Sequence, residues 1–352
     1  MGIFDPVDKF CQQNLTDFLV RDIMQYKDSY RREELFRLKS EYTEKEETMN
    51  QELAFKKLGE VIPDAVDLST RKLRVSPQQV LDVFGKSPIL CNDIVTILPF
   101  FSKEEREEIE EGIYQKQQAF WNNPAQVKYY TEIHPQLPSV LEHFAHFTNC
   151  ISPEEEGVVV DLGCGCGALM KRLLEKNKSV KIVGIDYAPH VLDVVSGLVP
   201  NLGTGRIELI NHDLRKGIPL PDASQTRIVS NWGIVNLLPD DLQRSFFEVY
   251  RVLKPGGRFT FSALIEGKKI SAKAFWNGTP NKLGFLWMAI NSLGRGIAQK
   301  GWKFEKELHL LFPVYSVEEL VEMAERAKQG IIQKEYTLMG RSITMVTQKS
   351  KS

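Results

Sequence analysis

The ten residues from Val158 to Gly167, V-V-V-D-L-G-C-G-C-G, constrain the fold more than any other part of this chain. Three adjacent valines predict a buried strand, because β-branched side chains favour extended backbone. The glycines at positions 163, 165 and 167 let the backbone turn tightly and leave no Cβ between the loop and a ligand. Residues 168–175 then place leucines at helical spacing. A strand, a glycine loop and a helix N-terminus together predict a cofactor-binding turn.

The acid that precedes this loop bears on the kind of cofactor. Gly163, Gly165 and Ala168 also satisfy a loose G-x-G-x-x-A dinucleotide fingerprint. Asp161, at the end of the strand, would repel a pyrophosphate but attract a ligand ammonium group. A second predicted strand, 181–186, ends in Asp186, which could accept hydrogen bonds from the ribose hydroxyls of either cofactor. Asp161 therefore favours a cationic cofactor, whereas Asp186 does not discriminate.

The segments that follow complete an alternating pattern of strands and helices. A third predicted strand, 207–210, runs into His212-Asp213-Leu214, where an acid could bind an adenine amino group. A fourth strand is predicted at 228–232, a helix at 246–253 that the sequence K-P-G-G-R stops, and a fifth strand at 259–263. The last helix is predicted to begin at an Ser316 N-cap, with Glu319 three residues later.

This ordered set resembles the class I S-adenosylmethionine-dependent methyltransferases, and most of all their quinone C-methyltransferase-like group. The motifs that carry the resemblance are, in order, D-L-G-C-G-C-G, G-I-D, H-D-L, W-G-I-V-N and R-V-L-K-P-G-G-R, within about residues 156–348. The resemblance implies an α/β fold with a Rossmann-like, mostly parallel sheet. It also implies a closing antiparallel hairpin formed by 335–339 and 343–347, and S-adenosyl-L-methionine as the cofactor.

The same resemblance implies roles for individual cofactor-binding residues. The glycine loop and Asp161 would hold the methionine portion, Asp186 the ribose, Asp213 and Leu214 the adenine edge, and Asn231 and Trp232 the side facing the substrate. The cofactor-binding candidates are Asp161, Gly163, Cys164, Gly165, Gly167, Asp186, Tyr187, Asp213, Leu214, Asn231 and Trp232. For four of these residues a purely structural role stays open: a solvated turn acid for Asp186, a helix cap for Asp213, a hydrogen-bonded loop amide for Asn231 and a core indole for Trp232.

The candidates for catalysis are less specific. In many members of the family a tyrosine before the first strand reaches the cofactor, and Tyr129 or Tyr130 would take that role unless they pack only in the core. His134 is a candidate base, and Asn236 lies in the segment after the fourth strand. This chain lacks the paired histidines that some hydroxyl methyltransferases carry there, so a strong general base is not evident. Trp276 is a further candidate pocket residue.

Outside the sheet the sequence predicts two additions. Residues 1–150 have helical periodicity, with helices expected at 17–38, 77–84, 89–98 and 103–121, the last capped by Ser102 with Glu105. This block would be either a lid and substrate domain or a dimerisation or docking domain. Residues 151–352 would form the cofactor-binding domain, with an aromatic-rich cap insertion at about 265–310.

The composition of the chain indicates which partners, location and metals to expect. Lys and Arg number 45 against 46 Asp and Glu, so no net field attracts the chain to nucleic acid or to an acidic membrane. No run has the length of a membrane span, and residues 1–30 lack a signal-peptide pattern. Five scattered cysteines favour a reducing cytoplasm. Cys164 and Cys166 have no neighbouring ligands that could complete a metal site, so no metal is expected.

The expected function is therefore methyl transfer to a small, largely apolar or aromatic metabolite, specialised or quinone-like, by a cytoplasmic enzyme with a possible homodimeric state. Two alternatives remain. The same fold could consume the aminocarboxypropyl arm of the cofactor as a lyase or cyclase that releases methylthioadenosine. It could also serve as a docking subunit without catalysis, although the intact glycine loop and downstream acids favour an enzyme.

Overall fold

The computed structural model describes residues 29–67, 72–86, 88–151, 157–198, 205–265, 303, 306–338 and 341–351. The chain divides into two compact units. The first comprises residues 1–75 with 96–101, and the second comprises residues 76–95 with 102–352. The predicted domain boundary near residue 150 stays a prediction, and most of the predicted cap insertion at 265–310, including Trp276, lies outside the described residues.

The first unit is built around one long helix. Helix α2 (Ser29–Val61) continues through the charged stretch and well beyond residue 38, where the sequence-based prediction ended it. The start of that predicted helix, residues 17–28, lies outside the described residues. Ala54, Phe55 and Leu58 are buried, and the Phe55 ring meets Phe100 of the short helix η1 (Leu98–Phe100) edge-on at 4.8 Å. Strands β1 (Val66–Asp67) and β2 (Lys72–Leu73) pair antiparallel in the same unit.

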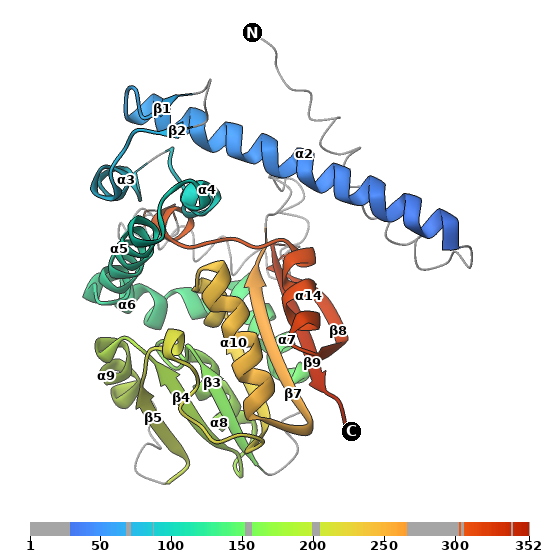
Figure 1. The fold of residues 1–352 in the computed structure, drawn as a ribbon. Coiled ribbons are helices and arrows are strands. Elements are labelled where there is room, and N and C mark those ends of the chain that lie inside the picture. The colour runs from blue at the N-terminus through green and yellow to red at the C-terminus, as the bar shows by residue number, and fades with distance from the viewer. Residues whose placement is uncertain are drawn as a thin grey trace. The chain divides into compact units, whose positions relative to one another are not determined.

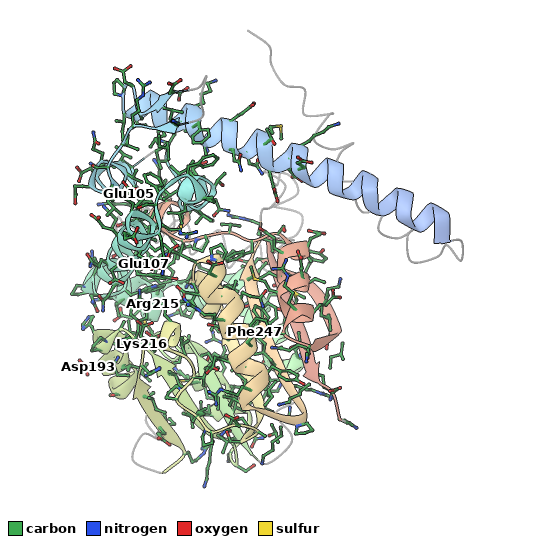
Figure 2. The ribbon with its side chains drawn as sticks, in the orientation of Figure 1. Glu105, Glu107, Asp193, Arg215, Lys216 and Phe247 are labelled. Carbon is green, nitrogen blue, oxygen red and sulfur yellow. The ribbon has the colours of Figure 1, made fainter. Side chains whose placement is uncertain are left out.

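A series of helices precedes the large sheet. They are α3 (Pro77–Val83), α4 (Cys91–Ile97), α5 (Lys103–Trp121), α6 (Pro124–Glu132), η2 (His134–Gln136) and α7 (Pro138–Cys150). The three helices predicted between residues 77 and 121 are present, and the Ser102–Glu105 capping box forms as expected. Helix α5 buries Ile109, Ile113 and Phe120 at helical spacing, whereas its glutamates, such as Glu107, point to the surface (Figure 2).

The sheet has seven strands in the order β5-β4-β3-β6-β7-β9-β8 (Figure 1). Their bounds are β3 (Val158–Leu162), β4 (Lys181–Asp186), β5 (Ile207–Asn211), β6 (Gln225–Asn231), β7 (Leu253–Leu264), β8 (Gln329–Thr337) and β9 (Ser342–Lys349). The first five run parallel, and β9 pairs antiparallel with both β7 and β8. The predicted Rossmann-like sheet with a closing antiparallel hairpin is confirmed.

Helices cover both faces of this sheet. Alternate residues of β3 face opposite sides, so that Val160 joins one core with α10 (Pro239–Val252) and α14 (Val317–Arg326). Val159 joins a second core with α7, α8 (Ala168–Lys176) and α9 (Pro189–Leu198). The near-continuous apolar character of the central strands follows from this double coverage.

Element boundaries differ from the sequence-based expectations in two places. Helix α10 begins at Pro239 instead of Phe246 and ends at Val252, because Leu242, Phe246 and Val249 form one buried stripe along it. Strand β7 begins directly at Leu253, so the K-P-G-G-R segment lies within it as an irregular stretch, with Gly256 at φ +78°. The N-cap of α14 is Ser316 with a Glu319 capping box, as predicted.

Candidate cofactor-binding and active site

A cavity of about 720 Å³ lies at the carboxyl ends of the parallel strands, within the second unit. Ligands of open α/β sheets bind in this position, because the loops that follow the strands diverge there. Of the predicted site residues that the structure describes, all line the cavity except Gly167. Gly167 is instead the N-cap of α8 at φ +74°, where a Cβ would meet the side chain of Val195 at 3.1 Å.

Two glycines shape the loop after β3 in different ways. Gly163 has φ +67°, and a Cβ there would lie 2.7 Å from the Cα of Gly233, so the loop can approach the segment after β6 only without a side chain. Gly165 has φ +51°, and a Cβ there would meet nothing within 4 Å. Gly163 therefore serves the packing of two loops, whereas Gly165 leaves open space on the cavity side.

Asp161 is the most unusual group in the cavity. Its side chain is 1% exposed, and its Oδ2 atom accepts no hydrogen bond in the part of the chain that the structure describes. Burial and the nearby charge of Asp186 raise the pKa of this carboxyl to about 8. A buried acid without a partner is costly, and a ligand cation at Oδ2 would relieve that cost.

Asp186 is buried too, at 8% exposure, but its two oxygens are partnered. Oδ2 accepts a hydrogen bond from the Gly165 backbone N–H at 3.0 Å, and Oδ1 accepts one from Ala188 N–H at 3.0 Å. Burial nevertheless raises its pKa. The alternative of a solvated turn acid is wrong, because the side chain is enclosed. Its role at the ribose, with Tyr187 beside it in the cavity wall, stays a prediction.

Asp213 follows β5 and is held by Arg215. It caps helix η3 (Leu214–Lys216) through the Arg215 backbone N–H, and it accepts further hydrogen bonds from the Arg215 guanidinium at 2.7 to 3.1 Å. Although partial burial raises the pKa of Asp213, these bonds outweigh that effect and lower it. The helix-cap alternative therefore describes its contacts in the structure. Binding of the adenine edge by Asp213 and Leu214 stays a prediction.

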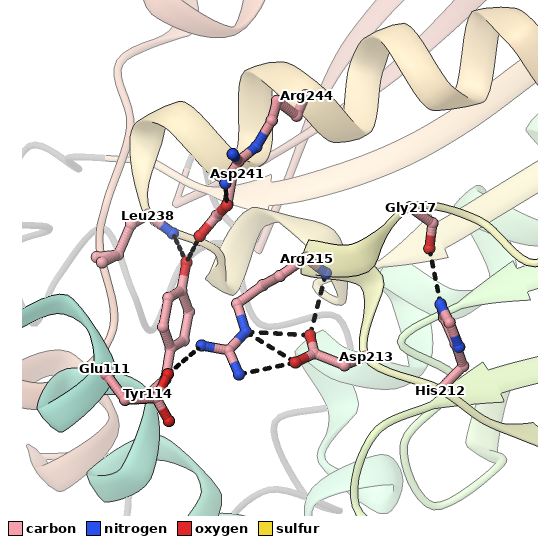
Figure 3. Close-up of polar contacts among 9 residues, drawn as sticks. All are labelled: Glu111, Tyr114, His212, Asp213, Arg215, Gly217, Leu238, Asp241 and Arg244. Carbon is pink, nitrogen blue, oxygen red and sulfur yellow. Dashed lines mark hydrogen bonds and ion pairs between the residues drawn. The ribbon is translucent and has the colours of Figure 1, made fainter. Parts of the chain in front are cut away.

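The same arginine links the segment after β5 to helix α5. Figure 3 shows Arg215 between Asp213 and Glu111, whose Oε2 lies 2.9 Å from Nη1, and the guanidinium lies 4.2 Å from the centre of the Tyr114 ring. Tyr114 in turn donates a hydrogen bond to Asp241 and accepts one from the Leu238 backbone N–H at 2.9 Å. Helix α5 is thus a wall of the cavity joined to η3 and α10 by specific polar contacts. The sequence carried no signal for this network.

A buried histidine supports the segment after β6. The Nε2 of His143 lies 2.7 Å from Oδ1 of Asn231, its Nδ1 lies 2.7 Å from Oγ1 of Thr337, and Ser262 also donates to Asn231 Oδ1. The ring stacks on Trp232 with a centroid distance of 4.2 Å. Asn231 is therefore a satisfied amide, as the alternative interpretation held, yet it still lines the cavity. No local pattern in the sequence indicated this role of His143.

Trp232 has an exceptional backbone. Its φ is +56°, a region in which residues other than glycine are strained. Its indole Nε1 donates a hydrogen bond to Ser342 Oγ at 3.0 Å. Asn236 donates from Nδ2 to the Trp232 carbonyl oxygen at 2.9 Å and so holds this turn. The indole is half-buried and reaches the cavity wall, so it is not a simple core residue.

The predicted catalytic candidates of the α6 segment lie together. The ring of Tyr130 meets those of Tyr129 and His134 at 5.1 and 5.0 Å, and His134 lies 5.9 Å from Trp232. Burial and the neighbouring His143 lower the pKa of His134 to about 4. At neutral pH the imidazole is uncharged and can accept a proton, but it is a weak base.

The far end of the cavity is made by residues that sequence analysis did not single out. Leu264 ends β7, Leu338 and Arg341 flank the turn between β8 and β9, and His309 and Phe312 come from the segment before α14. Only the pairing of distant strands brings them to the site, so no local pattern could have identified them.

Two further observations concern the described residues. Within them, no three histidine, cysteine or acidic side chains gather in a way that could hold a metal ion. None of the described helices combines the length and the apolar character that crossing a lipid bilayer requires.

Comparisons with known proteins agree on one family. Residues 159–257 match the methyltransferase domain model. The malonyl-[acyl-carrier protein] O-methyltransferase of Hahella chejuensis is 26% identical over 187 residues, which cover 53% of this chain and 64% of that protein. The demethylmenaquinone methyltransferase of Thermus thermophilus is 30% identical over 100 residues, which cover 28% and 44%. The chain thus spans less than two thirds of the length of either relative.

A solved structure of a SAM-dependent methyltransferase from Aquifex aeolicus has 16% sequence identity and a TM-score of 0.45, and the match covers 64% of this chain and 98% of that one. The match to the domain model covers the glycine loop and strands β4, β5 and β6 beside the cavity. Residues 159–257 thus form a methyltransferase domain of the class I type, whose cofactor is S-adenosyl-L-methionine.

Proposed function

We propose that this chain catalyses S-adenosylmethionine-dependent methyl transfer to a small molecule with a largely apolar or aromatic body, bound in the cavity. The observation that carries the proposal is Asp161, a buried carboxylate with an unpartnered oxygen beside an open glycine loop. A nicotinamide dinucleotide would bring a pyrophosphate to this position, whereas S-adenosylmethionine brings an ammonium group.

The residues around the cavity fit that cofactor. Asp161 would bind the methionine ammonium group, and the open space at Gly165 would receive its backbone-like portion. Asp186 would bind the ribose, and Asp213 with Leu214 would border the adenine. The remaining candidates of the cofactor site, Cys164, Tyr187, Asn231 and Trp232, line the same cavity.

Aromatic side chains support an apolar or aromatic acceptor. Trp121 of α5, Tyr130 of α6 and Phe312 line the cavity and contact one another, with centroid distances of 5.2 Å for Trp121–Tyr130 and 6.1 Å for Trp121–Phe312. Such surfaces bind planar or apolar groups and attract a sulfonium through cation–π interaction. Helices α5, α6 and α7 all contribute lining residues, which supports a substrate-binding role for the helical block before the sheet.

Methyl transfer from this cofactor does not need a strong general base. S-adenosylmethionine supplies an electrophilic methyl group, so the chain's own contribution is to align the acceptor and exclude water. His134 is neutral but weakly basic, since its pKa is lowered to about 4. This favours acceptor atoms that are already deprotonated or lose a proton easily. Tyr129 and Tyr130 would border the reacting centre, and Asn236 would hold the Trp232 turn in place.

Calorimetry tests the cofactor part of the proposal. We expect the purified chain to bind S-adenosylmethionine and S-adenosylhomocysteine, and not NAD. Tight NAD binding with no heat from the other two would contradict the assignment.

Isotope labelling tests the reaction. Incubation with cofactor labelled in the methyl group and a cell extract should transfer label to a small metabolite. Rapid release of methylthioadenosine without any acceptor would identify a lyase instead. Bound cofactor with no labelled product in small molecules, protein or RNA would support the docking alternative.

A further inference from the structure

We propose that the acceptor carries an anionic oxygen group, a carboxylate or a phosphate, that Arg341 binds together with His309 at the end of the cavity remote from Asp213. This inference rests on the proposed function, because it assigns the acceptor of that same site. It concerns recognition of the substrate and leaves open which of its atoms is methylated.

The strand order of the sheet separates Arg341 from the predicted cofactor residues. The cofactor residues lie at the ends of β5, β4, β3 and β6 or in the segments that follow them, and these four strands are adjacent in the sheet. The backbone carbonyl of Arg341 accepts a hydrogen bond from Ile265 N–H at 3.1 Å, at the end of β7, and Arg341 directly precedes β9. Because neighbouring strands lie about 4.8 Å apart, β9 is roughly 10 Å further along the sheet than β6. The Trp232–Ser342 hydrogen bond lies between the two regions.

The charges along the cavity are segregated. Its acidic lining residues are Glu111, Asp161, Asp186 and Asp213, which come from α5 and from β3, β4 and the segment after β5. Among the described lining residues, none that comes from β7, from the β8–β9 turn or from residues 308–314 is acidic. The acidic residues of the cavity therefore gather where the cationic cofactor is expected, together with Arg215 and Lys216, and none of the described lining residues at the Arg341 end is acidic.

The two arginines of the cavity differ in how their charge is balanced. Arg215 is paired with Asp213 and Glu111. Arg341 has no carboxylate within ion-pair distance among the residues that the structure describes, and its side chain contacts the neutral nitrogen of His309, with Nη2 to Nε2 at 3.4 Å. A guanidinium presents five donors in a fixed plane that matches a carboxylate or a phosphate. Arg341 thus has donors available for a ligand anion.

His309 completes the receptor. Since its Nε2 faces the Arg341 guanidinium, the proton of the neutral ring belongs on Nδ1, which can donate a hydrogen bond. The surrounding wall is apolar and includes Leu264, Leu308 and Leu338. The substrate class that fits is an apolar or aromatic molecule with one anionic group. The ion pair with Arg341 would fix the orientation of this molecule in the cavity.

The test uses matched small molecules as probes. The full-length chain is first titrated with S-adenosylhomocysteine, and the saturated protein is then titrated with 3-phenylpropionate, 3-phenylpropionamide and 2-phenylethyl phosphate. The variants are Arg341→Gln and, as a control, Arg326→Gln, which removes an exposed arginine on α14 that does not line the cavity. Thermal unfolding and S-adenosylhomocysteine affinity verify that each variant is folded.

We expect at least one of the two anionic probes to bind the wild-type chain at least tenfold more tightly than the amide. The preference should vanish in Arg341→Gln and persist in Arg326→Gln, with cofactor affinity unchanged within twofold. The stronger of the two anions identifies the group. Equal binding of anion and amide, no binding of either anion, or a preference that survives in Arg341→Gln would overturn the inference. Failure to bind S-adenosylhomocysteine in the first titration would instead count against the proposed function.

Discussion

Asp161 and Asp213 are two carboxylates of one cavity with opposite electrostatic situations. Asp213 is surrounded by hydrogen bonds from Arg215, which lower its pKa, and the pair extends to Glu111 on α5. Asp161 is buried with an unpartnered oxygen, and its pKa is raised to about 8. The chain thus balances the charge of one acid itself and leaves the other to be balanced by something else.

The difference separates structural groups from ligand-binding groups. A charged group that is already paired with other groups of the protein contributes to stability. A buried acid without a partner destabilises the free protein, and natural chains keep such a group when a ligand or a reaction needs it. By this criterion Asp161 is the strongest functional candidate of the site, and Asp213 belongs first to the wall that α5 and η3 form.

The largest expected effect is on cofactor binding by Asp161→Asn. Loss of the carboxylate should cost roughly 2 to 4 kcal/mol of S-adenosylmethionine affinity, since a buried ion pair with the ligand ammonium is lost. The free variant should be at least as resistant to urea as the wild type, because the amide removes a buried ionisable group. Calorimetry and urea unfolding measure the two effects, with Asp193→Asn on the exposed face of α9 as control. Unchanged affinity would assign Asp161 to structure.

The pH dependence of the free chain should show the same group. With a folded pKa of about 8 against 3.8 for an ordinary aspartate, Asp161 holds a proton in the folded state that the unfolded chain has released. Its contribution therefore lowers the free energy of unfolding as pH rises through this interval, by up to about 1.4 kcal/mol per pH unit. His134 and His143 have pKa values lowered to about 4, so they make stability rise with pH only below pH 6.5. They therefore do not oppose this trend between pH 6.5 and 8.

We thus expect the wild-type chain, free of cofactor, to lose stability from pH 6.5 to pH 8, and Asp161→Asn to lose clearly less. Thermal unfolding across this range measures the difference between the two proteins, in which titrations common to both cancel. Identical pH profiles would show that Asp161 is already ionised in the free protein.

Arg215→Met should have a smaller effect, and mainly on stability. The change removes the hydrogen bonds to Asp213 and the contact with Glu111 but keeps an apolar stem against Tyr114. We expect a loss of about 1 to 2 kcal/mol in the free energy of unfolding, since charge-assisted bonds at a partly buried site disappear. Cofactor affinity should fall less than in Asp161→Asn. A loss of cofactor affinity as large as that of Asp161→Asn, with unchanged stability, would show that Arg215 serves cofactor binding and not mainly stability.

The smallest effect is expected for Glu111→Gln. The Glu111 side chain is 55% exposed, so solvent screens its pairing with Arg215, and the change should cost less than about 0.5 kcal/mol. Glu107→Gln, which affects an exposed pair with Lys103 on the same helix, is the matched control. Urea unfolding of both variants tests this, and a cost above 1 kcal/mol for Glu111→Gln alone would show that the α5 wall depends on this ion pair.

Local patterns predicted the elements of the sheet well. The strand before the glycine loop, the caps at Ser102 and Ser316 and the closing hairpin are all present, because each depends on neighbouring residues and backbone preferences. The extent of α2 and the start of α10 were missed. Both helices continue through polar or mixed stretches because packing of a few buried side chains, such as Phe55 and Leu242, outweighs local propensity.

The sequence by itself determined that a glycine loop follows a buried strand, that acids stand at the ends of the first three strands or just beyond them, and hence which family the chain resembles. The structure brings almost all of the predicted cofactor residues to one cavity, because parallel strands direct their carboxyl ends to the same edge. Burial and pairing were decided by the tertiary structure alone. Whether an acid is satisfied depends on residues such as Arg215, Glu111, His143 and Arg341, which pack against the site from distant segments, and side-chain contacts of this kind leave no periodic signal in the sequence.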